Sequence, residues 1–180
     1  MPFIRKLAKQ HKELSLKELK LILVSSYHEE RFLALAVICL KYKQADNKQQ
    51  KKLCEFYLRH KKFVNNWDLV DASAYHLLGH YLFTAGDYSV LTTLARSIRL
   101  WDRRIAVIST FYFIKQDEYK PTLKLARLLM GDKEDLIHKA LGWMLREIGK
   151  RELGVLLKFL DQNYHKMPRV MLRYAIERLA

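Results

Sequence analysis

The chain has 180 residues, half of them hydrophobic and 12% aromatic, with six glycines and three prolines. This composition excludes a disordered chain and a turn-rich all-β fold, and the length suits one domain, residues 1–180, with a substantial core. The 33 Lys and Arg against 19 Asp and Glu give a net charge of +14, which favours a polyanionic partner: nucleic acid first, an anionic membrane surface second.

The first segment, M-P-F-I-R-K-L-A-K-Q, lacks the apolar stretch and small-residue cleavage site of a secretory signal. The longest apolar run, residues 32–40, is far shorter than the roughly 20 residues that span a bilayer. Cys39 and Cys54 are isolated thiols without metal-site spacing, and Cys39 lies inside that apolar run, where we expect it to be buried. The sequence therefore predicts a soluble, cytoplasmic protein with no membrane partner.

Apolar residues recur at steps of three and four along most of the chain, which is typical of amphipathic helices. The predicted helices span residues 16–24, 29–42, 48–60, 67–83, 89–98, 102–115, 121–130, 134–149, 152–164 and 168–179. Gly86, Gly131, Pro121 and Pro168 fall at the breaks, as turn and cap chemistry requires. No alternating strand pattern stands out, so the predicted fold is all-α.

Three of these helices begin alike. The segment E-E-R precedes F-L-A-L-A-V-I-C-L, D-R-R precedes I-A-V-I-S-T-F-Y-F, and H-K precedes A-L-G-W-M-L-R-E-I-G-K. Aligned at Arg31, Arg104 and Lys139, they are separated by 73 and 35 residues, so a missing unit should begin near Trp67. A period of 35–37 with two helices per unit predicts a curved, HEAT-like solenoid of antiparallel helix pairs.

This alignment predicts which side chains lie level with one another. It gives two sets of equivalent positions, one turn apart: Arg31, Trp67, Arg104 and Lys139, then Leu35, Asp71, Ile108 and Trp143. Trp67, Asp71, Arg104 and Trp143 are accordingly expected to face the same way. The apolar members of the second set leave another interpretation open, in which this row faces the core and Asp71 is a costly buried acid.

The stretch N-N-W-D-L-V-D at residues 65–71 places two carboxylates at the front of a helix. Asp68 is explained by the preference of a helix start for acids. Asp71 lies too far into the helix for that role and sits one turn after Trp67 on the same face. From the residues alone, a functional and a structural role for Asp71 remain equally open.

Other motifs give weaker indications of function. His76 and His80 have the spacing of metalloprotease ligands, but Leu77 stands where the catalytic glutamate would be, so no metal site is predicted. No phosphate-binding glycine loop or nucleophile motif occurs. Arg103 and Arg104 stand at a helix start, where the dipole disfavours cations, and an anionic partner there would explain them.

Four stretches together resemble a known family. N-N-W-D-L-V-D, R-R-I-A-V-I-S, H-K-A-L-G-W-M-L-R-E-I-G-K and M-P-R-V-M-L-R-Y-A-I-E-R-L occur in order over essentially the whole chain. They are similar to segments of DNA alkylation repair proteins of the AlkD type, HEAT-like repeat DNA glycosylases that excise N3- and N7-alkylated purines. The resemblance implies a monomeric glycosylase without cofactor, acting on double-stranded DNA with alkylated bases and associated with the nucleoid when bound.

The resemblance also implies roles for particular residues. The family's catalytic aspartate corresponds to Asp71, its two active-site tryptophans to Trp67 and Trp143, and its active-site arginine, which would grip a DNA phosphate, to Arg104. Trp101 matches neither tryptophan and is expected to pack. Further DNA contacts are expected from basic residues of the last helices: Arg103, Lys139, Arg146, Arg169 and Arg173.

One departure from the family concerns the beginning of the chain. M-P-F-I-R-K-L-A-K resembles a segment that, in the family, follows some further helices, so we expect a shortened form. The loss of those helices favours one alternative, a non-catalytic module that binds damaged or branched DNA. A second alternative is a helical-repeat protein–protein adaptor, which the basic charge disfavours.

Overall fold

A computed structural model describes residues 2–179, and within that range every regular element is a helix. The α-helices are α1 (Pro2–Gln10), α2 (Leu16–Leu23), α3 (His28–Gln44), α4 (Asn47–His60), α5 (Trp67–Ala74), α6 (His80–Ala85), α7 (Ser89–Ala95), α8 (Leu100–Lys115), α9 (Lys120–Leu128), α10 (Asp135–Gly149), α11 (Leu153–Asn163) and α12 (Arg169–Ile176). Short 3₁₀ segments, η1 (Lys61–Phe63) and η3 (Tyr164–Lys166), and a π-helical segment, η2 (Tyr75–Gly79), complete the chain. The predicted all-α helical repeat is confirmed.

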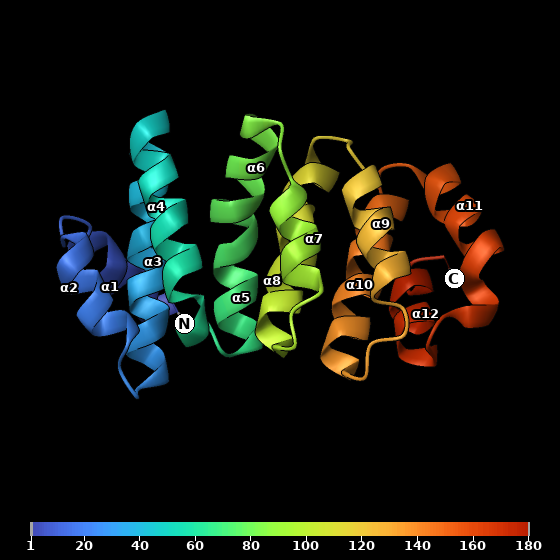
Figure 1. Cartoon of the computed structure of the whole chain (residues 1–180), viewed down its shortest axis with the longest axis horizontal. Coiled ribbons are helices and arrows are strands. Elements are labelled where there is room, and N and C mark those ends of the chain that lie inside the picture. The colour runs from blue at the N-terminus through green and yellow to red at the C-terminus, as the bar shows by residue number, and fades with distance from the viewer. Residues whose placement is uncertain (1, 180) are drawn as a thin grey trace.

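The helices lie side by side along the long axis, from α1 and α2 at one end to α11 and α12 at the other (Figure 1). Five of them, α3, α5, α8, α10 and α12, each pack on the next and form what we call the continuous layer. The helices α4, α7, α9 and α11 each contact a helix of this layer, and α1 packs on α3. One buried apolar cluster runs through the whole array, from Ala8 to Ala175, and includes Cys39 and Cys54.

Most predicted helix ends agree with the structure to within three residues. Capping explains several of them: Ser15 forms a capping box with Glu18, and Asp46 forms one with Gln49. Gly86 closes α6 in the left-handed conformation with φ of 70°. Helix α1 was not predicted, since the first predicted helix begins at residue 16.

The predicted single helix over residues 67–83 is interrupted by the π-helical η2. Here the chain crosses α8 closely, because a Cβ on Gly79 would lie 2.3 Å from the Ser109 carbonyl oxygen. The crossing of α10 and α12 is similar, since a Cβ on Gly142 would lie 2.5 Å from the Met171 carbonyl oxygen. These two glycines let the helices of the continuous layer approach one another.

The predicted register is wrong for two of its four helices, by one residue at Arg31 in α3 and by four residues, about one turn, at α5. Helices α5, α8 and α10 begin at Trp67, Leu100 and Asp135, which places Asp71, Arg104 and Lys139 at the same position in each helix. Arg104 is therefore level with Asp71, and not with Trp67 as the sequence alignment had it.

Loop contacts support the corrected register. Arg31 Nη1 donates to the carbonyls of Ser25 and Ser26, at 2.8 and 3.0 Å, and Arg103 Nη1 donates in the same way to Ser97 and Ile98, at 3.0 and 2.9 Å. Arg31 thus corresponds to Arg103. Because Arg103 and Arg104 are adjacent, the sequence alignment could match Arg31 to either of them.

Among residues 2–179, no helix is long and apolar enough to cross a bilayer.

Candidate active site

Asp71 and Arg104 form a two-pronged ion pair between α5 and α8. Arg104 Nε donates to Asp71 Oδ1 at 2.9 Å, and Nη2 donates to Oδ2 at 2.7 Å. Nη1 donates to the Leu136 carbonyl of the next repeat. The arginine side chain is 6% exposed and the aspartate side chain 18%. The planar guanidinium therefore fixes a carboxylate that still reaches the protein surface.

Two opposing effects act on the pKa of Asp71. Burial raises the pKa of Asp71 above its ordinary value, and the nearby Asp68 carboxylate adds to that rise. The hydrogen bonds and charge of Arg104 oppose it. An acid here would be costly without a partner. Arg104 supplies one, so a structural role for Asp71 is as compatible with this geometry as a functional one.

Asp68 has the helix-start role that the sequence predicted, and a second contact besides. Its Oδ1 accepts from the Leu69 backbone N–H at 2.8 Å, within the first turn of α5. Its Oδ2 lies 2.7 Å from His28 Nε2 at the start of α3. Asp68 thereby ties the starts of two neighbouring helices together.

Trp67 is the first residue of α5 and has an exposed side chain, with 54% of its surface accessible. Asn66 caps the helix there, since its Oδ1 accepts from the Trp67 N–H at 2.7 Å. Because Asp71 follows four residues later, Trp67 and Asp71 lie on one face of α5. An open indole thus stands one turn from the carboxylate.

Trp143 ends a row of aromatic side chains that crosses the continuous layer. Its ring lies 5.7 Å from that of Phe111 on α8, and Phe111 lies 5.2 Å from Tyr75 in η2. We call Tyr75, Phe111 and Trp143 the aromatic row. Lys115 lies over two of its rings, 4.9 Å from Phe111 and 5.1 Å from Tyr75, which is within the range of cation–π attraction.

The sequence analysis did not single out Tyr75, Phe111 or Lys115. A signal was present for the first, because Tyr75 follows Trp67 and Asp71 at further steps of four on the same helical face. Phe111 and Lys115 follow Arg104 by seven and eleven residues, which also preserves a face. Extending the face beyond Asp71 and Arg104 would have found all three.

The anionic partners expected for Arg103 and Arg104 are carboxylates of the chain itself. Arg103 binds Asp132 through Nε at 2.6 Å and Nη2 at 3.1 Å, in addition to its two loop carbonyls. These contacts occupy the Arg103 guanidinium with acceptors of the chain itself, so it has fewer N–H groups to offer a DNA phosphate.

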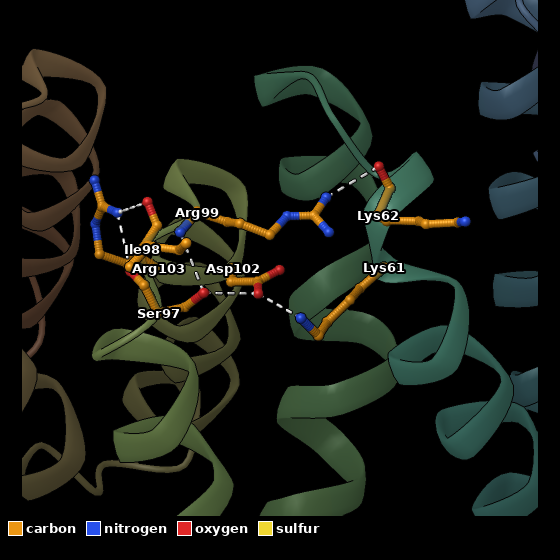
Figure 2. A network of polar contacts seen from close by, with 7 residues as sticks. All are labelled: Lys61, Lys62, Ser97, Ile98, Arg99, Asp102 and Arg103. Atoms are coloured by element: carbon orange, nitrogen blue, oxygen red, sulfur yellow. Dashed lines mark hydrogen bonds and ion pairs between the residues drawn. The ribbon is translucent and has the colours of Figure 1, made fainter.

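A polar network around the buried Asp102 fixes the start of α8 (Figure 2). The buried Asp102 carboxylate pairs with the Lys61 ammonium of η1 and accepts from Ser97 Oγ at 2.9 Å. Arg99 Nη2 donates to the Lys62 carbonyl at 3.2 Å. Because Arg104 lies a half-turn beyond Asp102, this network also restrains the arginine that holds Asp71.

The other predicted DNA contacts divide by their surroundings. Arg169 and Arg173 are exposed on α12, and Lys139 is half-buried on α10, level with Arg104. None of these three forms an ion pair with a carboxylate between residues 2 and 179. Arg146 differs, since it pairs with Glu177 and lies 3.9 Å from Glu147.

The two histidines with metalloprotease spacing lie among aromatic residues. His80 Nδ1 is 2.9 Å from the Tyr42 hydroxyl, and the His76 ring stacks on Tyr75 with centroids 3.8 Å apart. In the part of the chain that the structure describes, no three His, Cys, Asp or Glu side chains gather as metal ligands would.

Solved structures of other proteins share this fold. The structure is similar to that of a predicted DNA alkylation repair enzyme from Enterococcus faecalis, with 17% identity over 97% of this chain and 82% of that chain and a TM-score of 0.74. It is also similar to the crystal structure of AlkD2 from Streptococcus mutans, with 16% identity over 98% of this chain and 89% of that chain and a TM-score of 0.70. These likenesses show the fold.

A search of curated proteins finds no match to the sequence. The sequence profile described as DNA alkylation repair enzyme matches residues 1–179, which is nearly the entire chain. The chain therefore belongs to the DNA alkylation repair enzyme family.

Proposed function

We propose that this protein is a DNA glycosylase that hydrolyses the N-glycosidic bond of N3- and N7-alkylated purines in double-stranded DNA. The observation that carries the proposal is the Asp71 carboxylate, held by the Arg104 fork at a partly open surface beside the exposed Trp67. This arrangement places a fixed negative charge next to an aromatic surface, and both attract a cationic substrate.

The chemistry follows from the charge of the substrate. A purine alkylated at N3 or N7 is already cationic, so its glycosidic bond breaks with the electron pair moving to the base, which leaves neutral. Positive charge then develops on the sugar as an oxocarbenium ion, which an ionised Asp71 would stabilise. Asp71 would also orient the water that adds to C1′ and loses a proton. The products are the free alkylpurine and an abasic site.

The tryptophans and Arg104 have separate roles in this proposal. The indole faces of Trp67 and Trp143 would hold the cationic nucleotide, each worth roughly 0.5–2 kcal/mol by cation–π attraction. Arg104 already donates to Asp71 and to the Leu136 carbonyl. We therefore propose Arg104 as a positioning residue for the carboxylate, with a phosphate contact limited to the N–H groups that remain.

Binding to the DNA backbone would come from basic residues outside these ion pairs. The chain carries a net charge of +14, which raises the local concentration of a polyanion. Lys139, Arg169 and Arg173 have ammonium or guanidinium groups without a carboxylate partner in residues 2–179, so we propose them as phosphate contacts.

One observation favours a second candidate, a non-catalytic module that binds damaged DNA. Both oxygens of Asp71 accept from Arg104, and the pair as a whole is neutral. Such a pair stabilises a cation less than a free carboxylate does.

Product release distinguishes the two candidates. The protein is incubated with methylated duplex DNA, and free 7-methylguanine and 3-methyladenine are measured by chromatography, with unmethylated duplex as the control. We expect release from methylated DNA only, slowed in Trp67→Ala and in Trp143→Ala. Binding to methylated duplex without release would reject the glycosylase in favour of the binding module.

A further inference from the structure

A pocket of about 280 Å³ opens between four elements: α1, α3, α5 and η2. Phe32 and Leu35 of α3 and Ala72 of α5 form much of its apolar wall. Its volume is close to the lower end of small-molecule sites, roughly 300 Å³. The pocket lies one turn along the helical face from Asp71, because Tyr75 lines it and follows Asp71 by four residues. Neither the proposed glycosylase chemistry nor the DNA contacts above use it.

Two stacked rings form one wall of this pocket. Tyr75 and His76 both line it, with ring centroids 3.8 Å apart and planes inclined by 33°. They are consecutive residues of the π-helical η2. The wider π turn reduces the angle between successive side chains and so brings both rings to one side. Such π segments recur at functional sites.

The pocket is surrounded by positive charge. Arg5 and Lys9 of α1 and Lys43 of α3 line it, no carboxylate does, and Lys115 lies beside Tyr75. None of these four cations forms an ion pair among the described residues. Burial, followed by the charges of Lys43, Lys115 and Arg5, lowers the pKa of His76 to about 4, so its ring is neutral at pH 7 and stacks without adding charge.

A stacked pair of rings among apolar side chains, with cations around it, suits a ligand that is aromatic at one end and anionic at the other. A nucleotide has that construction. Aromatic side chains stack on bases of any sequence, while basic residues hold the phosphates on either side. An acidic peptide would use the cations but not the stacked rings. A lipid would not need a stacked pair of aromatic rings.

We propose that this pocket binds one unpaired nucleotide of a DNA strand, with its base against Tyr75 and His76 and its phosphates at Arg5, Lys9 and Lys43. The inference rests on the DNA substrate of the proposed function, not on its chemistry. It gives the protein a preference for duplexes in which one base is already unstacked, as happens next to a lesion.

The test compares two duplexes of the same sequence, one intact and one with a single additional 2-aminopurine nucleotide on one strand. Affinity for each is measured by titration, and 2-aminopurine fluorescence reports stacking. Wild type should bind the bulged duplex about tenfold more tightly, as expected for one stacked base, and should quench its fluorescence. Tyr75→Phe keeps a ring and should behave as wild type. Tyr75→Leu and His76→Leu should lose the quenching and most of the preference.

Thermal unfolding shows whether each variant is folded. Because Tyr75 and His76 are substituted separately, the test still holds if one of the two variants fails to fold. Equal affinity of wild type for the two duplexes would overturn the inference, as would an unchanged preference in folded Tyr75→Leu and His76→Leu. The outcome is separate from glycosylase activity. A protein that releases no alkylpurine but shows a Tyr75-dependent preference rejects the proposed catalysis and supports this pocket.

Discussion

Asp71 and Arg104 occupy the same position in consecutive helices of the continuous layer, and their side chains meet in a two-pronged ion pair with N–O distances of 2.9 and 2.7 Å. The contact joins neighbouring repeats and presents a carboxylate to the surface. Stability and the proposed chemistry therefore depend on the same two residues, and experiments must separate them.

The first prediction concerns stability. Arg104→Gln should lower the free energy of unfolding by about 3 kcal/mol, because removing one partner leaves the other charge buried without compensation. The value is at the low end for such pairs since Asp71 keeps some exposure to water. Urea denaturation measures it, with the exposed Arg169→Gln as a control expected to stay within about 0.5 kcal/mol of wild type. A loss below about 1 kcal/mol for Arg104→Gln would show that the Asp71–Arg104 pair contributes little to the stability of the fold.

The second prediction concerns the close crossing of η2 and α8. Gly79→Ala should destabilise the protein by about 1–3 kcal/mol, because the new methyl group would lie 2.3 Å from the backbone oxygen of Ser109, which has little freedom to move. Gly131→Ala is the matched control, since nothing lies within 4 Å of its added Cβ. Comparable stabilities for the two variants, measured by thermal unfolding, would show that the helices are not in close contact there.

The third prediction concerns acid stability. His76 has a pKa of about 4 in the folded protein against 6.5 for an ordinary histidine. Between these values the unfolded chain binds more protons at this residue, so stability should fall as pH decreases from 6.5 towards 4. The variant His76→Phe removes this contribution while keeping a ring. Its thermal midpoint should decline less than that of wild type over the same window, and parallel declines would refute a buried neutral histidine.

The fourth prediction separates proposed phosphate contacts from internal ion pairs. Arg173→Ala should reduce the slope of log affinity against log salt by about 0.9, as expected for the loss of one phosphate contact. Arg103→Ala should instead lower thermal stability, because it breaks the pair with Asp132, and should keep the slope of wild type. The opposite assignment of the two effects would show that Arg103 faces the DNA.

Much of the fold could be predicted because helical periodicity and caps are local signals. Apolar spacing and residues such as Gly86 and Pro168 gave most helix ends. The π segment at Tyr75–Gly79 could not be predicted in this way, since it depends on how Gly79 meets α8. Helix α1 carries the same kind of apolar spacing as the other helices, so its sequence also held a local signal for it.

The candidate site was predicted less completely than the fold. Asp71 and Arg104 were both expected on one face, yet their pairing was not predicted, because the sequence alignment set Arg104 level with Trp67, four residues and about one turn before Asp71. Tyr75 and Lys115 lie on faces that the pattern already marked, but their meeting depends on the packing of η2 against α8. Local patterns identify a helix face, while contacts between helices decide which residues share a site.

The most direct test of the account is single-turnover release of 7-methylguanine from methylated duplex by wild type and by Asp71→Asn. Asparagine keeps the shape of the side chain and can still accept one hydrogen bond from Arg104, but it has no charge. We expect release to slow by about a hundredfold or more, the usual cost of removing one electrostatic stabiliser of a transition state, with duplex affinity unchanged. Equal release rates for a folded Asp71→Asn and wild type would contradict Asp71 as the catalytic carboxylate.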